Sequence, residues 1–448
     1  MEKFIINGGK KLKGKVTVSG AKNVALKMMV AACLTDEEVV ISNIPYISDL
    51  FVMAEIIREL GGEVKISSHK IRIQIKNIKS SKISLDKAAE IRTSSMFLAP
   101  LLVRKGSAII PNPGGCRIGA RPIDRIIEGL KKMGADIYYN RNDGYFHSKI
   151  SSAKSFKGKL KGTTYRFEKS THTGTETMII AGVLAEGKTR LENAAQEPEI
   201  DELIDFLNKM GANIKRVNPR TIVIQGVEKL HGVNFSVGPD RNEIVTFAIG
   251  AIITGGDVFI KNVNKTGLLE FLEKLEKIGG GFEELGNGIR FFSKGELEAV
   301  DVTTSPYPGF MTDWQGPWAV LMTKANGIST IHETVYESRF GYVSELKKMG
   351  ADIKFFNPQI KNSDKLYNFN IDDDKKENMH AIKIKGPAAL HNAAVEISDL
   401  RAGATLVLAS LAVLGQSVVF GVEHLDRGYE KFEERLKALG ANIERVKI

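Results

Sequence analysis

The chain has 448 residues, and its 63 lysines and arginines against 53 aspartates and glutamates give a formal net charge of +10. With 43% apolar and 26% charged residues it has the composition of an ordinary globular protein, which excludes a collagen, a disordered tail and a disulfide-rich miniprotein. This length suits two large domains or three smaller ones.

The sequence favours a protein of a reducing compartment. Two cysteines, Cys33 and Cys116, are too few for a disulfide framework, and the start MEKFIINGGKKLKG has no apolar signal core, so we expect a cytoplasmic protein. The longest uncharged run, 402–422, is interrupted by Gly403 and Gly415 and predicts a buried helix, a turn and a buried strand rather than membrane insertion. Without a basic stripe interleaved with aromatic residues, we expect no nucleic acid partner, and the positive charge suits a small anionic substrate.

A helix-ending phrase recurs six times along the chain. In phrases such as ELGGEV and KMGADI, an amphipathic segment ends at a glycine and an extended segment follows. A glycine at that place suits the left-handed conformation that closes a helix. The six glycines are Gly61, Gly134, Gly211, Gly279, Gly350 and Gly440.

A second pattern recurs in step with the first: an apolar helix, a polar or glycine turn, and a β-branched strand. Its copies begin at Met28, Met96, Met178, Thr246, Trp318 and Leu406. Each of the six repeats, roughly 70 to 75 residues long, therefore predicts a buried helix, a strand, an amphipathic helix and a strand, with room for one more hairpin strand. Helices that are apolar all round must be enclosed, which predicts α/β domains with helices inside and sheets facing out.

The interval between the fifth and sixth repeats is longer because of an insertion at 361–380. Its acidic run, Asp372, Asp373 and Asp374, is either a metal cluster or the solvated tip of a hairpin, and we favour the hairpin tip and assign it no function.

The first residues with chemical potential stand in the first two repeats. Lys22 and Asn23 open a helix, where backbone donors and a lysine suit a phosphate or carboxylate, although Asn23 is alternatively only a cap. In the loop PNPGGCRIGARPID, positive neighbours favour the thiolate of Cys116, which is either a proton donor, acceptor or nucleophile, or a small residue filling the loop. Pro122 is expected to open the following helix, and Cys33 is expected to be an inert core residue.

Four arginines interrupt apolar surroundings: Arg92, Arg339, Arg401 and Arg427. A buried arginine needs a carboxylate or phosphate partner. Internal pairing with Asp399 or Asp426 accounts for one or two of them, whereas several at equivalent repeat positions indicate a substrate with several negative charges. Asp313, in YPGFMTDWQGPW, is either a helix cap or a general base toward a substrate hydroxyl.

Several segments in their joint order resemble the UDP-N-acetylglucosamine 1-carboxyvinyltransferase (MurA) family of enolpyruvyl transferases over the full length. They are SGAKN at 19–23, PGGCRIGARPID at 113–124, NAAQEPEI at 193–200, PDRNE at 239–243, MTD at 311–313, ESRF at 337–340, DLRAGA at 399–404 and DRGYE at 426–430. The resemblance implies two inside-out α/β barrel domains, each of three β-α-β-α-β-β units, over 21–237 and over 1–20 plus 238–448, with the active site between them.

The reaction that this resemblance implies moves the enolpyruvyl group of phosphoenolpyruvate to the 3-hydroxyl of UDP-N-acetylglucosamine and releases phosphate, the first committed step of peptidoglycan synthesis. It proceeds by addition and elimination. No metal, organic cofactor or obligate protein partner is implied.

The resemblance also implies residue roles. Cys116 is the acid at phosphoenolpyruvate and the fosfomycin target, and Asp313 takes the proton from the attacking hydroxyl. Lys22, Arg121, Arg401 and Arg427 hold phosphate and carboxylate, with Arg92 and Arg339 in support; Asn23 binds the sugar, Asp124 the uracil, and Lys169 and Asp399 complete the substrate-binding set.

Two departures from the family pattern fall on the nucleotide side. Where the family shows DKVSVGAT, this chain has EKSTHTGTET, with Ser170, Thr171, His172 and Thr173, and Arg125-Ile126 stands where a Leu-His pair is usual. His172 is either a new ligand to phosphate or a solvated loop histidine. The alternatives are therefore an enolpyruvyl transferase for another sugar nucleotide or hydroxylated anion, or a catalytically silent paralogue that binds a sugar nucleotide.

Overall fold

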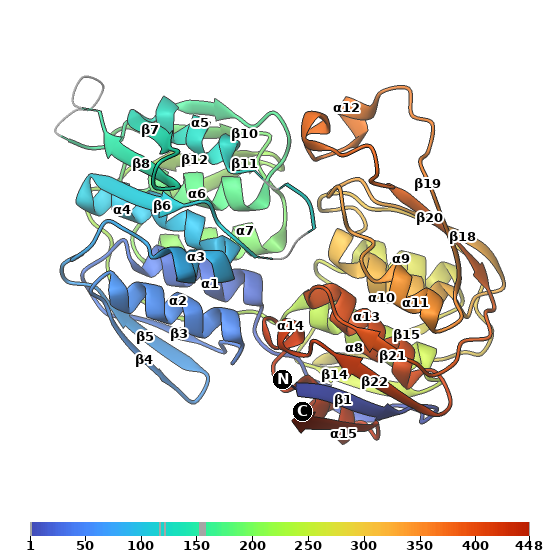
Figure 1. Cartoon of the computed structure of the whole chain (residues 1–448). Helices are drawn as coiled ribbons and strands as arrows, with labels where there is room; N and C mark the ends of the chain where they lie inside the picture. The colour runs from blue at the N-terminus through green and yellow to red at the C-terminus, as the bar shows by residue number, and fades with distance from the viewer. Residues whose placement is uncertain (1, 116–117, 121, 152–157, 448) are drawn as a thin grey trace. The chain divides into compact units, whose positions relative to one another are not determined.

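A computed structural model describes residues 2–115, 118–120, 122–151 and 158–447 (Figure 1). The predicted site residues Cys116 and Arg121 lie outside the described residues, as does Arg117.

Contacts within the chain divide it into two units. Unit 1 comprises Met1–Ser19, Arg117–Arg121 and Pro239–Ile448, and unit 2 comprises Gly20–Cys116 and Pro122–Gly238. The junctions fall one residue from the predicted boundaries, and the short segment 118–120 groups with unit 1 rather than with the first domain.

Unit 2 contains three sheets, ordered β13-β3-β5-β4, β6-β8-β7 and β11-β12-β10-β9 over its described residues. Its strands are β3 (Val39–Ser42), β4 (Glu63–Ser67), β5 (Lys70–Gln74), β6 (Ser107–Pro111), β7 (Ala135–Asn140), β8 (Tyr145–Ile150), β9 (Thr164–Arg166), β10 (Lys188–Glu192), β11 (Asn213–Asn218), β12 (Thr221–Gln225) and β13 (Asn234–Ser236). Its helices are α1 (Lys22–Ala32), α2 (Ser48–Glu59), α3 (Leu85–Glu90), η1 (Arg92–Phe97), α4 (Leu98–Lys105), α5 (Asp124–Lys132), α6 (His172–Gly182) and α7 (Pro198–Lys209).

Unit 1 likewise contains three sheets over its described residues, ordered β21-β22-β1-β23, β15-β16-β14-β2 and β17-β18-β20-β19. Its strands are β1 (Glu2–Asn7), β2 (Lys13–Thr17), β14 (Asp257–Lys261), β15 (Gly281–Leu285), β16 (Gly288–Phe292), β17 (Val302–Thr303), β18 (Gly327–His332), β19 (Asp352–Phe356), β20 (Ala381–Gly386), β21 (Ala394–Glu396), β22 (Gln416–Phe420) and β23 (Asn442–Lys447). Its helices are α8 (Arg241–Ile253), α9 (Leu269–Lys277), η2 (Thr312–Trp314), α10 (Gln315–Met322), α11 (Val343–Lys348), α12 (Ser363–Leu366), η3 (Ile371–Asp373), α13 (Leu400–Leu411), α14 (Glu423–Asp426) and α15 (Phe432–Ala438).

Five of these six sheets share one arrangement in the described part of the chain. The outer strand is parallel to its neighbour, and the remaining two pairings are antiparallel, as in β13 with β3, β3 with β5, and β5 with β4. In the sixth sheet a single parallel bridge between Lys82 and Ile109 stands in place of the outer strand. The predicted sixfold repeat is therefore visible in the strand order itself.

The apolar helices of the repeats are enclosed, as predicted. Every residue of α8 and α13 is buried, and so is every residue of α10. The second helix of each repeat is amphipathic; α7, for example, buries Leu203, Phe206 and Leu207 while its polar face stays accessible. Strands such as β4 alternate buried and exposed residues, because only one face of each sheet is covered.

The six punctuating glycines all have positive φ values, between 85° and 100°, which confirms the predicted helix ends. The start of α1 at Lys22 is also as predicted. The start of α5 is not: the helix begins at Asp124, because Ile123, with φ −105° and ψ 13°, does not have helical geometry, so Pro122 precedes the helix.

The insertion at 361–380 connects the antiparallel strands β19 and β20, and Asp372 and Asp373 are exposed, so the acidic run lies at the solvated end of a hairpin as predicted. The rest of the insertion is more ordered than a simple hairpin tip. The insertion carries α12 and η3, and Figure 1 shows it extending from the ends of β19 and β20. Tyr367 and Phe369 are buried and stack at 4.8 Å between ring centroids, and Nε2 of His380 lies 2.7 Å from Oδ2 of Asp374. Tyr367 also packs edge-on against His332 of β18, with 5.7 Å between ring centroids, so aromatic contacts attach the insertion to the sheet of unit 1.

The uncharged run 402–422 forms most of α13 and all of β22, as predicted. Within the described ranges, no helix has both the length and the apolar character needed to cross a bilayer. Nor do the described residues bring together three side chains of the kinds that ligate metals.

Candidate active site

In unit 1, the buried helices α8 and α13 begin in the same way. Asp240 caps α8 by accepting a hydrogen bond from the backbone N–H of Asn242 at 2.8 Å, and Asp399 caps α13 by accepting from Arg401 N–H at 2.9 Å. Each cap is followed within two residues by an arginine, Arg241 or Arg401. Positive helix ends and guanidinium groups together favour an anion at these starts.

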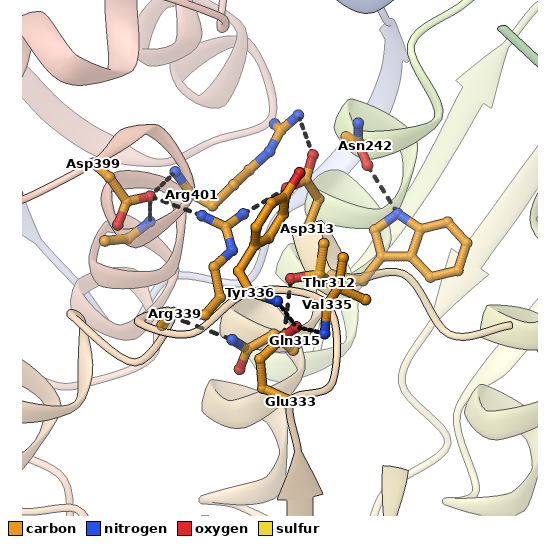
Figure 2. Close-up of polar contacts among 12 residues, drawn as sticks. Asn242, Thr312, Asp313, Gln315, Glu333, Val335, Tyr336, Arg339, Asp399 and Arg401 are labelled. Atoms are coloured by element: carbon orange, nitrogen blue, oxygen red, sulfur yellow. Dashed lines mark hydrogen bonds and ion pairs between the residues drawn. The ribbon is translucent and has the colours of Figure 1, made fainter. Parts of the chain in front are cut away.

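Asp313, in the turn η2 before α10, is ion-paired with two of the predicted arginines (Figure 2). Its Oδ1 accepts from Nη2 of Arg339 at 2.5 Å, and its Oδ2 lies 3.2 Å from Nη2 of Arg401. The Asp313 side chain is 21% exposed, whereas those of Arg339 and Arg401 are 5% and 9% exposed. Neither η2 nor α10 receives a side-chain cap from Asp313, so the helix-cap alternative is wrong.

The charges around Asp313 determine its protonation state. Burial alone would raise the pKa of this carboxyl, but the positive charges of Arg401 and Arg339 outweigh burial and lower the pKa to about 2. Asp313 is therefore a carboxylate at neutral pH, and while both arginines remain bound to it, it is a weak base.

Arg339 also reaches the cap of α13, since its Nη1 lies 3.5 Å from Oδ1 of Asp399. One of the predicted arginines therefore does pair internally with Asp399, as one of the two alternatives from the sequence proposed. Asp426 is engaged elsewhere, with Arg445 at 2.7 Å.

A buried carboxylate holds the loop that carries Arg339. Glu333 accepts from the backbone N–H groups of Val335 and Tyr336 at 2.7 and 3.0 Å, and from the hydroxyl of Thr312 at 2.8 Å (Figure 2). Because Thr312 directly precedes Asp313, this carboxylate ties the loop to the turn that carries the candidate base.

Sequence reasoning missed two residues of this cluster. The hydroxyl of Tyr429 accepts from Nη1 of Arg401 at 3.0 Å and lies 2.8 Å from the hydroxyl of Thr246. Arg241 is buried, and its guanidinium stands 5.3 Å from the ring of Tyr307. Both belong to segments that carried the resemblance, DRGYE and PDRNE, so attention to every polar residue in those segments would have found them.

Arg427, the remaining predicted arginine of unit 1, is half-buried at the end of α14, two residues before Tyr429. The segment 118–120 also contributes to unit 1, since the carbonyl of Ile118 accepts from the backbone N–H of Ser338 at 3.2 Å. Ser338 directly precedes Arg339.

In unit 2, Lys22 and Asn23 occupy the first turn of α1. Nζ of Lys22 lies 2.6 Å from Oδ2 of Asp49 in α2, so this lysine has an internal carboxylate partner. Asn23 does not cap the helix, because Ala21 holds that position without a side-chain hydrogen bond. The cap alternative for Asn23 is therefore wrong.

The other predicted residues of unit 2 occupy starts of helices or neighbouring loops. Arg92 is the first residue of η1. Gly115, with φ +105°, packs so closely against Arg92 that a Cβ atom on residue 115 would lie 3.2 Å from Cβ of Arg92. Asp124 is exposed at the start of α5, and Lys169 is half-buried three residues before α6. Cys33 is buried, and this burial raises the pKa of its thiol to about 12, as an inert core residue requires.

Other solved structures share this fold. The chain resembles the enolpyruvyl transferase NikO from Streptomyces tendae with a TM-score of 0.85, 24% identity and coverage of 100% of this chain and 99% of that one. It resembles EPSP synthase from Acinetobacter baumannii with a TM-score of 0.72, 20% identity and full coverage of both chains. The fold is thus the two-domain α/β fold of enolpyruvyl transferases.

The sequence pattern of the EPSP synthase (3-phosphoshikimate 1-carboxyvinyltransferase) family matches residues 6–436, so the chain belongs to that family. Among curated relatives, the UDP-N-acetylglucosamine 1-carboxyvinyltransferase of Koribacter versatilis is 41% identical over 450 residues, covering 100% of this chain and 97% of the relative. UDP-N-acetylglucosamine 1-carboxyvinyltransferase 3 of Caldanaerobacter subterraneus subsp. tengcongensis is 42% identical, with complete coverage of both chains.

Proposed function

We propose that this protein is an enolpyruvyl transferase that moves the enolpyruvyl group of phosphoenolpyruvate to the 3-hydroxyl of UDP-N-acetylglucosamine and releases phosphate. This reaction commits its product to peptidoglycan synthesis. The full-length relatives at 41% and 42% identity carry the corresponding name. The observation that carries the proposal is Asp313 held between Arg339 and Arg401, since it combines a carboxylate base with a binding site for an anion.

The arrangement supports a base that becomes active on substrate binding. An anionic donor that takes over hydrogen bonds of Arg401 and Arg339 weakens their hold on Asp313, and the pKa of the carboxyl then rises from about 2. Asp313 in that state accepts the proton of the sugar hydroxyl as its oxygen bonds to C2 of phosphoenolpyruvate. An acid adds a proton to C3, and loss of that proton together with phosphate from C2 completes the transfer.

The remaining roles follow from the resemblance. We assign the C3 proton donor to Cys116 and the binding of phosphate and carboxylate to the basic set Lys22, Arg92, Arg121, Arg339, Arg401 and Arg427. We assign the sugar nucleotide to Asn23, Asp124 and Lys169, with Asp399 in support. A phosphate that displaces Asp49 from Lys22 would follow the same logic as displacement of Asp313 from its arginines.

We further propose that each unit closes as an inside-out α/β barrel, with unit 2 and unit 1 as the two enolpyruvyl transferase domains. The enclosed helices and the one-sided burial of the strands support this reading. We place the protein in the cytoplasm, which agrees with its sparing use of cysteine.

The decisive experiment measures phosphate release from phosphoenolpyruvate with and without UDP-N-acetylglucosamine, combined with mass spectrometry of the nucleotide. We expect release only with both substrates and a nucleotide heavier by one enolpyruvyl unit. Binding of the nucleotide without release would indicate the silent paralogue and contradict the proposal.

A second candidate acceptor, another sugar nucleotide, has one observation in its favour: His172 lies at the start of α6 against a buried carboxylate, in the segment that departs from the family pattern. The same mass-spectrometric measurement over a panel of UDP-sugars and shikimate 3-phosphate decides between acceptors.

A further inference from the structure

A buried charged cluster joins the first two turns of α1 and α6 in unit 2. Nζ of Lys27 lies 3.3 Å from Oε2 of Glu176, and Nε2 of His172 lies 3.3 Å from Oε1 of the same carboxylate. Lys27 and Glu176 are 5% and 0% exposed. The roles proposed so far use neither of them.

The cluster is costly for a protein interior. Neither oxygen of Glu176, nor Nε2 of His172, has a hydrogen bond of good geometry from any described residue, although the three charged or polar groups are in contact. A buried ion pair that lacks supporting hydrogen bonds is often no more stable than apolar side chains of the same volume. Stability alone therefore does not account for a lysine and a glutamate at these buried positions of α1 and α6.

The contacts of the cluster lead to candidate substrate-binding residues. Nζ of Lys27 donates to the backbone carbonyl of Asn23 at 2.8 Å, and Asn23 is in the first turn of α1. His172 is the first residue of α6, three residues after Lys169. The Lys27–Glu176 pair thus connects the helix starts that carry Asn23 on one side and Lys169 and His172 on the other.

The two faces of His172 differ. Its Nε2 is buried against Glu176, while the side chain as a whole is 26% exposed, so its exposure comes from other atoms of the residue. A carboxylate in contact with one ring nitrogen limits the orientations that an imidazole can adopt. His172 thus belongs to the first turn of α6 rather than to a loop, and its side chain remains partly accessible.

We propose that Lys27 and Glu176 are positioning residues for the sugar nucleotide: they hold the first turns of α1 and α6 in register, and Glu176 orients His172 as part of the acceptor site. This inference rests on the proposed function. It concerns the nucleotide acceptor, whereas phosphoenolpyruvate stays assigned to Cys116 and the basic set named under the proposed function.

The test is the double variant Lys27→Met/Glu176→Leu, which replaces both charges by apolar side chains of similar size. We expect its melting temperature to be equal to or above that of the wild type. We expect KM for UDP-N-acetylglucosamine to rise about tenfold, with KM for phosphoenolpyruvate and kcat within about twofold of wild type. Calorimetric titration with the nucleotide alone should show the same loss of affinity.

Two further variants complete the design. Lys277→Gln/Glu273→Gln removes an exposed ion pair of α9, 2.6 Å in length, and serves as the charge-matched control that leaves all constants unchanged. His172→Leu abolishes the contact with Glu176, whereas His172→Gln keeps a donor there. We expect the leucine variant to reproduce the rise in KM for the nucleotide. The glutamine variant should lose only about half as much binding free energy, which leaves a rise in KM of roughly threefold.

The outcomes separate the two hypotheses. A double variant that is stable and has a normal KM for the nucleotide shows that the pair is only structural and overturns the inference, as does an equal rise of KM for both substrates. If the double variant does not fold, the KM of His172→Leu decides in the same way. Wild-type protein that neither binds nor converts UDP-N-acetylglucosamine overturns the proposed function itself, and the inference with it.

Discussion

Nη2 of Arg339 lies 2.5 Å from Oδ1 of Asp313, so the candidate base of this protein is bound to one of its own candidate anion-binding groups. In the protein without substrates, the negative charge that these arginines need is supplied internally. Binding an anionic donor is then an exchange of partners, in which the cost of releasing Asp313 is offset by the new contacts.

The first prediction concerns the variant Asp313→Asn. We expect kcat to fall by about 10²- to 10⁴-fold, because proton abstraction is lost. Calorimetry should find phosphoenolpyruvate bound as tightly as in the wild type or tighter, since no carboxylate then competes for Arg339 and Arg401. A nearly normal kcat would remove Asp313 from the role of base.

The second prediction concerns the pH dependence of kcat/KM. In the free wild-type protein the pKa of Asp313 is about 2, so Asp313 should contribute no acidic limb above about pH 3. Arg339→Gln removes one positive neighbour, which raises the pKa of Asp313 and moves the acidic limb to higher pH. The control is Arg290→Gln, which breaks a partly exposed pair with Asp257 on the sheet of β14 and β16. A profile that Arg339→Gln leaves unchanged would contradict the electrostatic argument.

The third prediction concerns stability and Glu202, in α7. Burial raises the pKa of this carboxyl to about 7, although it accepts a hydrogen bond from the backbone N–H of Gly238 at 2.6 Å. A pKa above the unfolded value means that the folded state loses stability as the pH rises from about 4.5 to 7. We therefore expect Glu202→Gln to stabilise the protein at pH 8 by about 2 kcal/mol, after allowance for partial exposure.

Unfolding by denaturant at pH 8 and at pH 4 measures whether Glu202→Gln raises or lowers the free energy of unfolding. The stabilisation by Glu202→Gln should vanish near pH 4, where Glu202 is protonated in both states. An equal effect at both pH values would show that lost contacts, rather than ionisation, account for the change.

The fourth prediction concerns the two thiols. The pKa of about 12 for Cys33 makes its thiolate scarce, so the native protein should react with iodoacetamide once, at Cys116, and a second time only after unfolding. In Cys116→Ser, native labelling and inhibition by fosfomycin should both disappear. Inhibition that persists in this variant would show that the cysteine assignment is wrong.

Local and repeated signals made much of the fold predictable. The glycines from Gly61 to Gly440 adopt positive φ values because the end of a helix is a local event that the sequence phrase describes fully. The enclosed helices followed from apolar residues on all sides, as in α13. Errors at the ends of helices were small. The helix α5, for example, begins at Asp124 and not at Pro122 as predicted.

Long-range pairings were the part that sequence reasoning did not reach. The contacts of Asp313 with Arg339 and Arg401 join residues 26 and 88 positions apart, and nothing local decides which acid meets which base. The pairing of Lys27 with Glu176 was missed for the same reason. The aromatic packing of Tyr367 in the insertion was missed because its acidic run suggested a solvated tip.

The place of β1 has a consequence for synthesis on the ribosome. The strand β1 lies between β22 and β23. Its Ile5 is opposite Val418 of β22 on one side and Glu444 of β23 on the other, so β1 pairs with strands that come much later in the sequence. Unit 2 has all its strands once residue 236 has emerged, whereas the sheet of β1 waits for the last strand to be translated. The growing polypeptide must therefore keep β1 unpaired while all of unit 2 and most of unit 1 are made, and unit 2 is able to fold before the sheet of β1 is complete.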